Sequence, residues 1–145
     1  MTTTDLAHCV SSLCSATADD AFAYLSDPSR LGEWALGCWG AVAHSGGVVR
    51  GTSLFDGGET FARADVDPTR RIVDFEVGDD PARLVRRISA RVVPGDHLGE
   101  PPTASLVLLT AWRTRSLADD RWHRLVASHE AEVLLLRHRI EAWAP

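Results

Sequence analysis

Six short segments of β-type sequence follow one another in the middle of the chain, and this run constrains the fold more than any other feature. Gly-Gly pairs and Asp-Pro steps separate the segments, and both are common connectors of hairpins. Short connections between consecutive strands predict an antiparallel meander. The six segments are residues 38–44, 48–55, 61–67, 71–77, 87–93 and 104–113.

The flanking segments predict one more strand and three helices. Residues 6–14 are typical of a strand, and "ATADDAFAYL" predicts a helix that Thr17 caps and after which Pro28 follows. "PSRLGEWA" predicts a second short helix, and residues 120–143 predict a long amphipathic one. Only this last helix is long enough to cover the sheet.

These elements predict an α+β fold with a single domain, residues 1–145. The expected order is a strand, two short helices, a six-stranded antiparallel meander and a long C-terminal helix over the concave sheet. Because a curved sheet is wider than one helix, we expect a cavity between them.

Composition excludes several classes of function. The net charge is −5 without a basic segment, so nucleic acid is not an expected partner. No apolar run is long enough to span a membrane and no signal pattern is visible, so we expect a cytoplasmic protein. The three cysteines and six histidines lack the spacing of metal motifs, so no metal is expected. The chain has no lysine, which excludes Schiff-base chemistry on a protein amine, and no cofactor is predicted.

One histidine lies within the apolar stripe of the last helix. At about 100° per residue, Trp122, Val126, Val133 and Ile140 fall on one line, with His129 close beside it. Such an imidazole could act as a general acid or base in a dry pocket. Equally, it could be a core histidine hydrogen-bonded to a strand carbonyl or to Thr110. Both interpretations stay open.

Tight hairpin turns predict which strand residues face the helix. Ala62 is expected opposite Phe75, with Arg63 and Asp74 paired on the outer face. Assuming that Arg113 faces water, the last strand should direct its even-numbered residues inward. The predicted inward set includes Val49, Gly51, Ser53, Ile88, Ala90, Val92, Leu106, Leu108, Thr110 and Trp112, whereas Arg87, Arg91 and Arg115 should point outward.

The candidate site follows from these inward positions. His129 and Thr110 are the candidate catalytic residues, with Thr110 or Ser53 orienting a carbonyl. The candidate ligand-binding residues are Trp34, Ser53, Ala62, Val73, Phe75, Ala90, Trp112, Val126 and Val133. Core packing is the alternative role for the tryptophans.

The stretch "LCSATADDAFAYLSDPSRLGEWALG" resembles the START-like, or SRPBCC, superfamily, and within it sequences described as polyketide cyclase/dehydrase. The matching positions are Ala16, Phe22, Leu25, Asp27, Pro28, Leu31 and Trp34, with Thr17 in place of the usual proline. This resemblance implies a helix-grip fold with a deep cavity under the C-terminal helix. It does not imply a single activity, because members bind lipids, hormones or polyketides and some catalyse cyclisation or dehydration.

Three functions therefore stay open. The first is a cofactor-free cyclase or dehydratase that acts on a small hydrophobic molecule, polyketide-like, aromatic or lipid. The second is a non-catalytic carrier or sensor of such a molecule, and the third is a protein-interaction module; a homodimer is compatible with each. An enzyme should have a carboxylate or hydroxyl near His129, and the predicted inward set contains no carboxylate.

Overall fold

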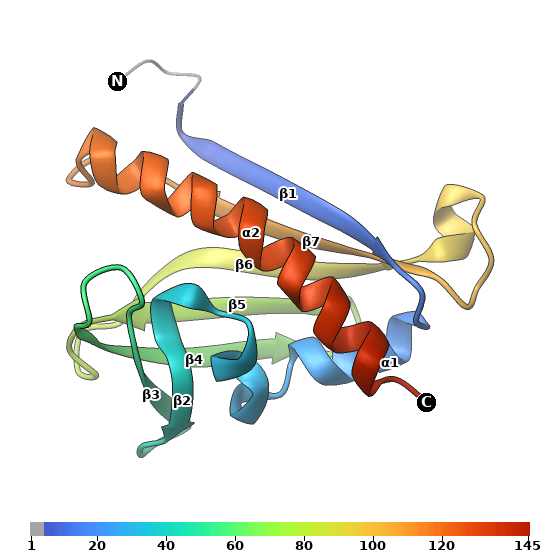
Figure 1. The fold of residues 1–145 in the computed structure, drawn as a ribbon, viewed down its shortest axis with the longest axis horizontal. Helices are drawn as coiled ribbons and strands as arrows, with labels where there is room; N and C mark the ends of the chain where they lie inside the picture. Colours follow the sequence, from blue (N-terminus) through green and yellow to red (C-terminus); the bar gives the residue numbers. More distant parts are fainter. Residues whose placement is uncertain (1–4) are drawn as a thin grey trace.

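The computed structural model describes residues 5–145 as one antiparallel seven-stranded sheet with a long helix across its front face (Figure 1). The strand order in the sheet is β1-β7-β6-β5-β4-β3-β2, so the N-terminal strand pairs with the last one. The elements are β1 (Ala7–Cys14), α1 (Ala18–Leu25), η1 (Pro28–Glu33), η2 (Leu36–Cys38), β2 (Trp39–Ala43), β3 (Val48–Thr52), β4 (Glu59–Asp67), β5 (Ile72–Gly78), β6 (Val85–Pro94), η3 (Gly95–Leu98), β7 (Ser105–Trp112) and α2 (Asp119–Trp143). The predicted α+β helix-grip architecture is confirmed, and the short 3₁₀ turns η2 and η3 are additions to it.

Local capping explains how the chain leaves β1 and returns to the sheet. The Thr17 side chain accepts a hydrogen bond from the Asp20 backbone N–H at 3.2 Å, which caps α1. Asp27 accepts from the Ser29 N–H at 3.0 Å, and Pro28 occupies the first turn of η1. These two caps position α1 and η1 beneath α2.

The C-terminal half of α2 packs tightly on the sheet. Val133, Leu136 and Ile140 are buried in the main core together with Tyr24 and Leu25 of α1. Leu136 has no exposed surface. This end of the molecule is solid, so α2 is anchored here.

The β4–β5 hairpin closes two residues later than its sequence suggests. Ala64 lies opposite Phe75, whereas the tight-turn assumption had placed Ala62 there. The loop has four residues, 68–71, and Arg71 adopts a left-handed φ of 53°. A register shift of two residues leaves each side chain on the same face of the sheet, so Ala62 and Phe75 still face inward. On the outer face Arg63 pairs with Glu76 at 3.3 Å.

The predicted orientation of β7 is wrong. Its odd-numbered residues face α2 and are fully buried: Ser105, Val107, Leu109 and Ala111. The error came from Arg113, whose side chain is only 4% exposed because it bonds to Asp5 at 3.1 Å and to Asp119. Partnered on both sides, this guanidinium lies on the covered face rather than in water.

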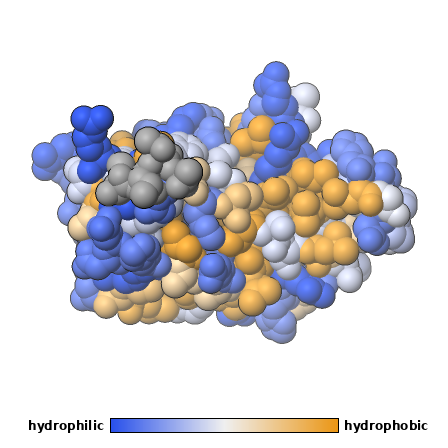
Figure 2. Space-filling view, turned by 90° about the horizontal axis from the view of Figure 1, so that it is seen from above, coloured by the Kyte–Doolittle hydropathy of each residue, from blue (hydrophilic) through white to orange (hydrophobic). Residues whose placement is uncertain are grey.

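As a consequence, apolar side chains of β7 face outward. Leu106 and Leu108 are half-buried there, and Trp112 is 36% exposed. Next to them on edge strand β1, Leu13 is exposed and lies opposite Leu106. Viewed from the side of β1, the molecule presents an apolar area bordered by hydrophilic residues (Figure 2).

Candidate functional site

The N-terminal half of α2 covers a cavity with one face, while Trp122 and Val126 on another face pack against Ala111 of β7 and Leu117. The cavity has a volume of about 1070 Å³ and is bounded by η1, η2, the β3–β4 loop, strands β4 to β6, the segment before α2, and α2 itself. A volume of this size can hold a small organic molecule. Its apolar wall includes Leu31, Trp34, Phe75, Val77, Ile88 and Leu109, with the Trp34 and Phe75 rings in edge-to-face contact at 6.0 Å.

Five of the predicted site residues line this cavity. They are Trp34, Ser53, Ala62, Phe75 and His129. These residues come from η1, the β3–β4 loop, β4, β5 and α2, so the fold brings together positions from across the chain.

The other predicted site residues lie elsewhere. Val73, Ala90 and Val133 face inward but belong to the packed core. Val126 is half-buried against the Trp122 cluster. Thr110 and Trp112 lie on the outer face of β7, for the reason given above, and the Thr110 hydroxyl donates to the Cys9 Sγ at 3.4 Å. Thr110 therefore cannot orient a molecule in the cavity.

A carboxyl group lies next to His129, which the sequence analysis did not anticipate. Glu132 is 7% exposed and lines the cavity. One of its oxygens accepts a hydrogen bond from the Leu36 N–H at 3.2 Å, and the other lies 4.0 Å from the His129 Nε2. Burial raises the pKa of Glu132 to about 8, although the bond from Leu36 opposes this change.

The imidazole of His129 is also neutral at physiological pH. Its side chain is 3% exposed, and burial, with a smaller contribution from the charge of His8, lowers its pKa to about 4. Within residues 5–145 its Nδ1 has no hydrogen-bond partner. The site thus combines a free imidazole base and a protonated carboxylic acid, and their 4.0 Å contact is not an ion pair at neutral pH.

The sequence pattern did not predict Glu132 in the site, because only the apolar stripe of α2 was expected to face the sheet. On the helical wheel Glu132 lies roughly 80° from the line through Trp122 and Ile140. A second stripe, Arg121, Leu125, Ser128 and Glu132, repeats at intervals of four, three and four residues and faces the cavity. This polar stripe beside the apolar one was the available signal.

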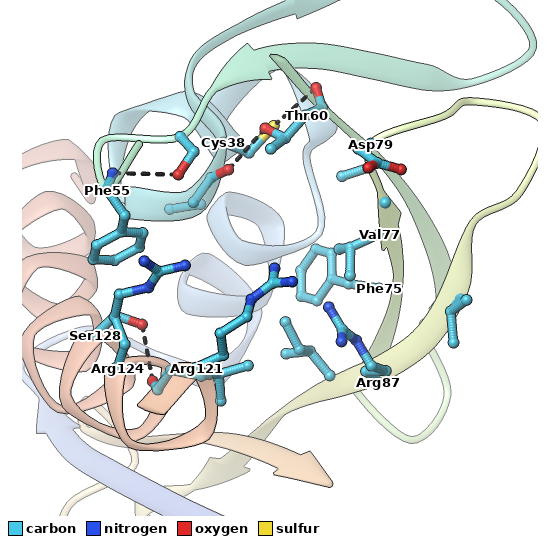
Figure 3. A pocket seen from close by; sticks show the side chains of 18 of the residues that line it. Cys38, Phe55, Thr60, Phe75, Val77, Asp79, Arg87, Arg121, Arg124 and Ser128 are labelled. Carbon is cyan, nitrogen blue, oxygen red and sulfur yellow. Dashed lines mark hydrogen bonds between the residues drawn. The ribbon is translucent and has the colours of Figure 1, made fainter. Parts of the chain in front are cut away.

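A β-bulge places an arginine in the cavity. The register between β5 and β6 shifts after the pair Phe75–Ile88, since the next pair is Glu76–Arg86, and Arg87 is the extra residue. Instead of pointing outward as predicted, Arg87 lines the cavity. In Figure 3 it extends toward the same part of the pocket as Arg121, beside Phe75 and Val77. Burial, and then the charge of Arg121, lower the pKa of Arg87.

The cysteine in the wall is not an activated nucleophile. The Cys38 Sγ lies 3.9 Å from the Thr60 carbonyl, and burial raises the pKa of its thiol. Among residues 5–145, no three His, Cys, Asp or Glu side chains form a group that could hold a metal ion. In the same part of the chain, no helix is both long and apolar enough to cross a membrane.

Comparisons of sequence give no relative. No protein-family model matches the chain. No curated protein matches it either.

Comparisons of structure give many similar proteins. The Zhui aromatase/cyclase from Streptomyces sp. R1128 superposes with a TM-score of 0.66 at 16% identity, covering 96% of this chain and 98% of that one. A START superfamily protein from Mycobacterium smegmatis gives a TM-score of 0.66 at 12% identity, covering 94% and 98%. The protein XoxI from Bacillus cereus gives 0.71 at 13% identity, covering 93% and 95%. At these identities the similarity is one of fold, and the fold of this chain is the START-like helix-grip fold.

Proposed function

We propose that the cavity binds a small, mainly hydrophobic molecule, polyketide-like or aromatic, and that His129 and Glu132 transfer protons in a cofactor-free dehydration or cyclisation of it. The observation that carries the proposal is that two buried titratable side chains, His129 and Glu132, lie 4.0 Å apart in the wall of the cavity, where burial shifts their pKa values in opposite directions. A base and an acid whose pKa values are shifted in opposite directions are a common arrangement in proton-transfer sites.

In a dehydration of a β-hydroxy carbonyl compound, the two groups have complementary roles. His129 accepts the proton from the carbon between carbonyl and hydroxyl, and the C–H electrons form the new C=C bond. Glu132 donates its proton to the departing hydroxyl, which leaves as water. The two groups lie 4.0 Å apart, so a small approach to hydrogen-bond distance then returns the proton on His129 to Glu132.

An aldol-type cyclisation uses the same groups. His129 removes the proton from the nucleophilic carbon, whose electrons form the new C–C bond to a carbonyl carbon, and Glu132 protonates the oxygen of that carbonyl. The apolar wall excludes water and holds the chain folded. One of the structurally similar proteins is named an aromatase/cyclase, which is consistent with this chemistry.

Native mass spectrometry of the purified protein tests the proposal. We expect a bound small molecule in the wild type, and in Glu132→Gln and His129→Ala a bound molecule that is one water heavier, or a linear isomer of the same mass that chromatography of the released molecule separates, because conversion stops. Glu130→Gln and His123→Ala, both exposed on the same helix, serve as matched controls and should resemble the wild type. Circular dichroism should show every variant folded.

Three other outcomes would contradict the proposal. If every variant carries the same molecule, the protein is a carrier or sensor, the second candidate function, which the predominantly apolar wall also favours. If no variant carries a small molecule and none can be loaded, the cavity does not serve binding. If the wild type carries a bound molecule but His129→Ala does not fold, His129 is a structural residue.

A further inference from the structure

We propose that the ligand carries a carboxylate group, which binds between Arg87 and Arg121 at the mouth of the cavity. This inference rests on the proposed function and specifies the class of ligand: an elongated apolar acid. Neither arginine has a role in the proton transfers assigned to His129 and Glu132.

The position of Arg87 is the first support. Strand alternation alone would send this side chain to the outer face, where Arg86 already meets Asp65 at 2.7 Å and Asp74 at 3.2 Å. The bulge in β6 turns Arg87 away from these carboxylates and into the cavity. A local distortion thus moves a guanidinium from an acidic surface to an apolar pocket, as bulges next to binding sites commonly do.

The missing counter-charge is the second support. Residues 5–145 provide neither Arg87 nor Arg121 with an ion-pair partner. In that same part of the chain, the Arg87 Nε is buried without a hydrogen-bond acceptor. Arginine does not lose its proton in proteins, so this charge cannot be neutralised from within. A ligand anion would satisfy the donor and relieve the repulsion between the two cations.

The carboxylates of the cavity wall form no ion pair with these two arginines within residues 5–145. Asp56 accepts a hydrogen bond from the Gly58 N–H at 2.8 Å, Glu59 lies 3.9 Å from Arg50 on the neighbouring strand, and the wall also contains Asp79 and Asp120. Two further arginines line the cavity: Arg83 lies 3.1 Å from Asp80, and Arg124 lies over the Phe55 ring at 5.1 Å. Arg87 and Arg121 are therefore the two cations left for a ligand.

The surroundings define the rest of the molecule. Phe75 and Val77 lie beside both guanidinium groups in Figure 3, so an apolar body would continue from the acid group. Arg121 and His129 are eight residues apart on α2, which corresponds to about 12 Å along the helix axis. A ligand that reaches from the arginines to His129 therefore has the length of about three fused rings or an equally long chain.

Fluorescence titration with a matched pair of probes tests this inference. The probes are anthracene-2-carboxylic acid and its uncharged primary amide, which differ only in charge and hydrogen-bond donors. We expect the wild type to prefer the acid by roughly tenfold or more, the range of a charge-assisted hydrogen bond. Arg87→Gln and Arg121→Gln should each lose that preference and bind the amide as the wild type does. Arg91→Gln, on the outer side of the same strand, is the control and should behave as wild type.

The outcomes separate the two proposals. Equal binding of acid and amide by the wild type would overturn the carboxylate site while supporting a hydrophobic ligand cavity. Binding of neither probe would overturn both. Should Arg87→Gln fail to fold, Arg121→Gln decides alone, because its side chain is exposed and its loss leaves the core intact.

Discussion

The two halves of α2 lie on the same sheet and differ in what is packed beneath them. The C-terminal half inserts Leu136 and Ile140 into a core that α1 completes from below with Tyr24 and Leu25. The N-terminal half has no helix of comparable length beneath it, only 3₁₀ turns and loops, and it covers a cavity of about 1070 Å³. Because α1 lies under only one half of α2, the molecule has a solid end that supplies stability and a hollow end that can accept a ligand.

The polar groups follow this division. On the hollow side α2 presents Arg121, Ser128 and Glu132, none of which would be tolerated between two packed layers. Trp122, in the first turn of α2, fixes this end of the helix to β7, since its ring is buried against Ala111 and Leu117 while its indole N–H donates to Asp5 at 2.7 Å. Because apolar contacts anchor α2, its polar residues can face the cavity without having to hold the helix on the sheet.

The largest expected effect comes from matched truncations in the two halves. Ile140→Ala removes a fully buried side chain from the solid end and should cost about 2–5 kcal/mol in free energy of unfolding. Leu125→Ala removes a half-buried side chain that already borders the cavity, so little packing is lost, and about 1 kcal/mol or less is expected. Urea denaturation of both variants measures the difference. Equal costs would mean that the two halves are packed alike.

A second prediction concerns the pH dependence of stability. In the unfolded chain Glu132 ionises near its ordinary pKa of 4.5, but in the folded protein it keeps its proton up to about 8. Folding takes up a proton in between, so stability falls as the pH rises through this window. His129 acts in the opposite sense, because its folded pKa of about 4 is below the ordinary 6.5, and its contribution rises only up to pH 6.5.

Between pH 6.5 and 8 the change in stability therefore comes mainly from Glu132, because the contribution of His129 levels off within about one pH unit of 6.5. The wild type should lose roughly 2 kcal/mol over this interval, the limit for one proton over that span. Glu132→Gln, which cannot ionise, should show a flat profile there and keep the rise below pH 6.5. Urea midpoints measured in steps across both ranges test this, with Glu130→Gln as an exposed control. A wild-type profile that stays flat above pH 6.5 would show that Glu132 is ionised in the folded protein.

Much of the architecture could be predicted because it rests on local signals. Turn residues divided the strands, Thr17 and Pro28 marked the helix starts, and one long amphipathic segment remained to cover the sheet. Ser53, Ala62 and Phe75 were predicted in the wall from strand alternation and His129 from the helical period, whereas Trp34 was a candidate because it ends the second short helix.

The remaining site residues depend on features that no local pattern encodes. Thr110 and Trp112 were predicted on the wrong face because Arg113 is buried between two carboxylates, one of which, Asp5, is distant in sequence. Arg87 was assigned outward because a bulge cannot be seen in strand alternation. Glu132 was overlooked because a charged residue beside an apolar stripe normally marks the solvent side, and here that side faces a cavity.

The smallest expected effect lies on the outer face of the sheet, which belongs to neither half of α2. Arg63 bonds to Glu76 at 3.3 Å with its side chain 43% exposed, so water and salt screen the pair. Removing it with Arg63→Ala should change the free energy of unfolding by less than about 0.5 kcal/mol. Thermal melts at low and high salt, compared with Glu76→Ala and the double variant, measure the coupling of the two side chains. A coupling well above about 1 kcal/mol would mean that the outer face also holds the sheet together, and that the solid end is not its main source of stability.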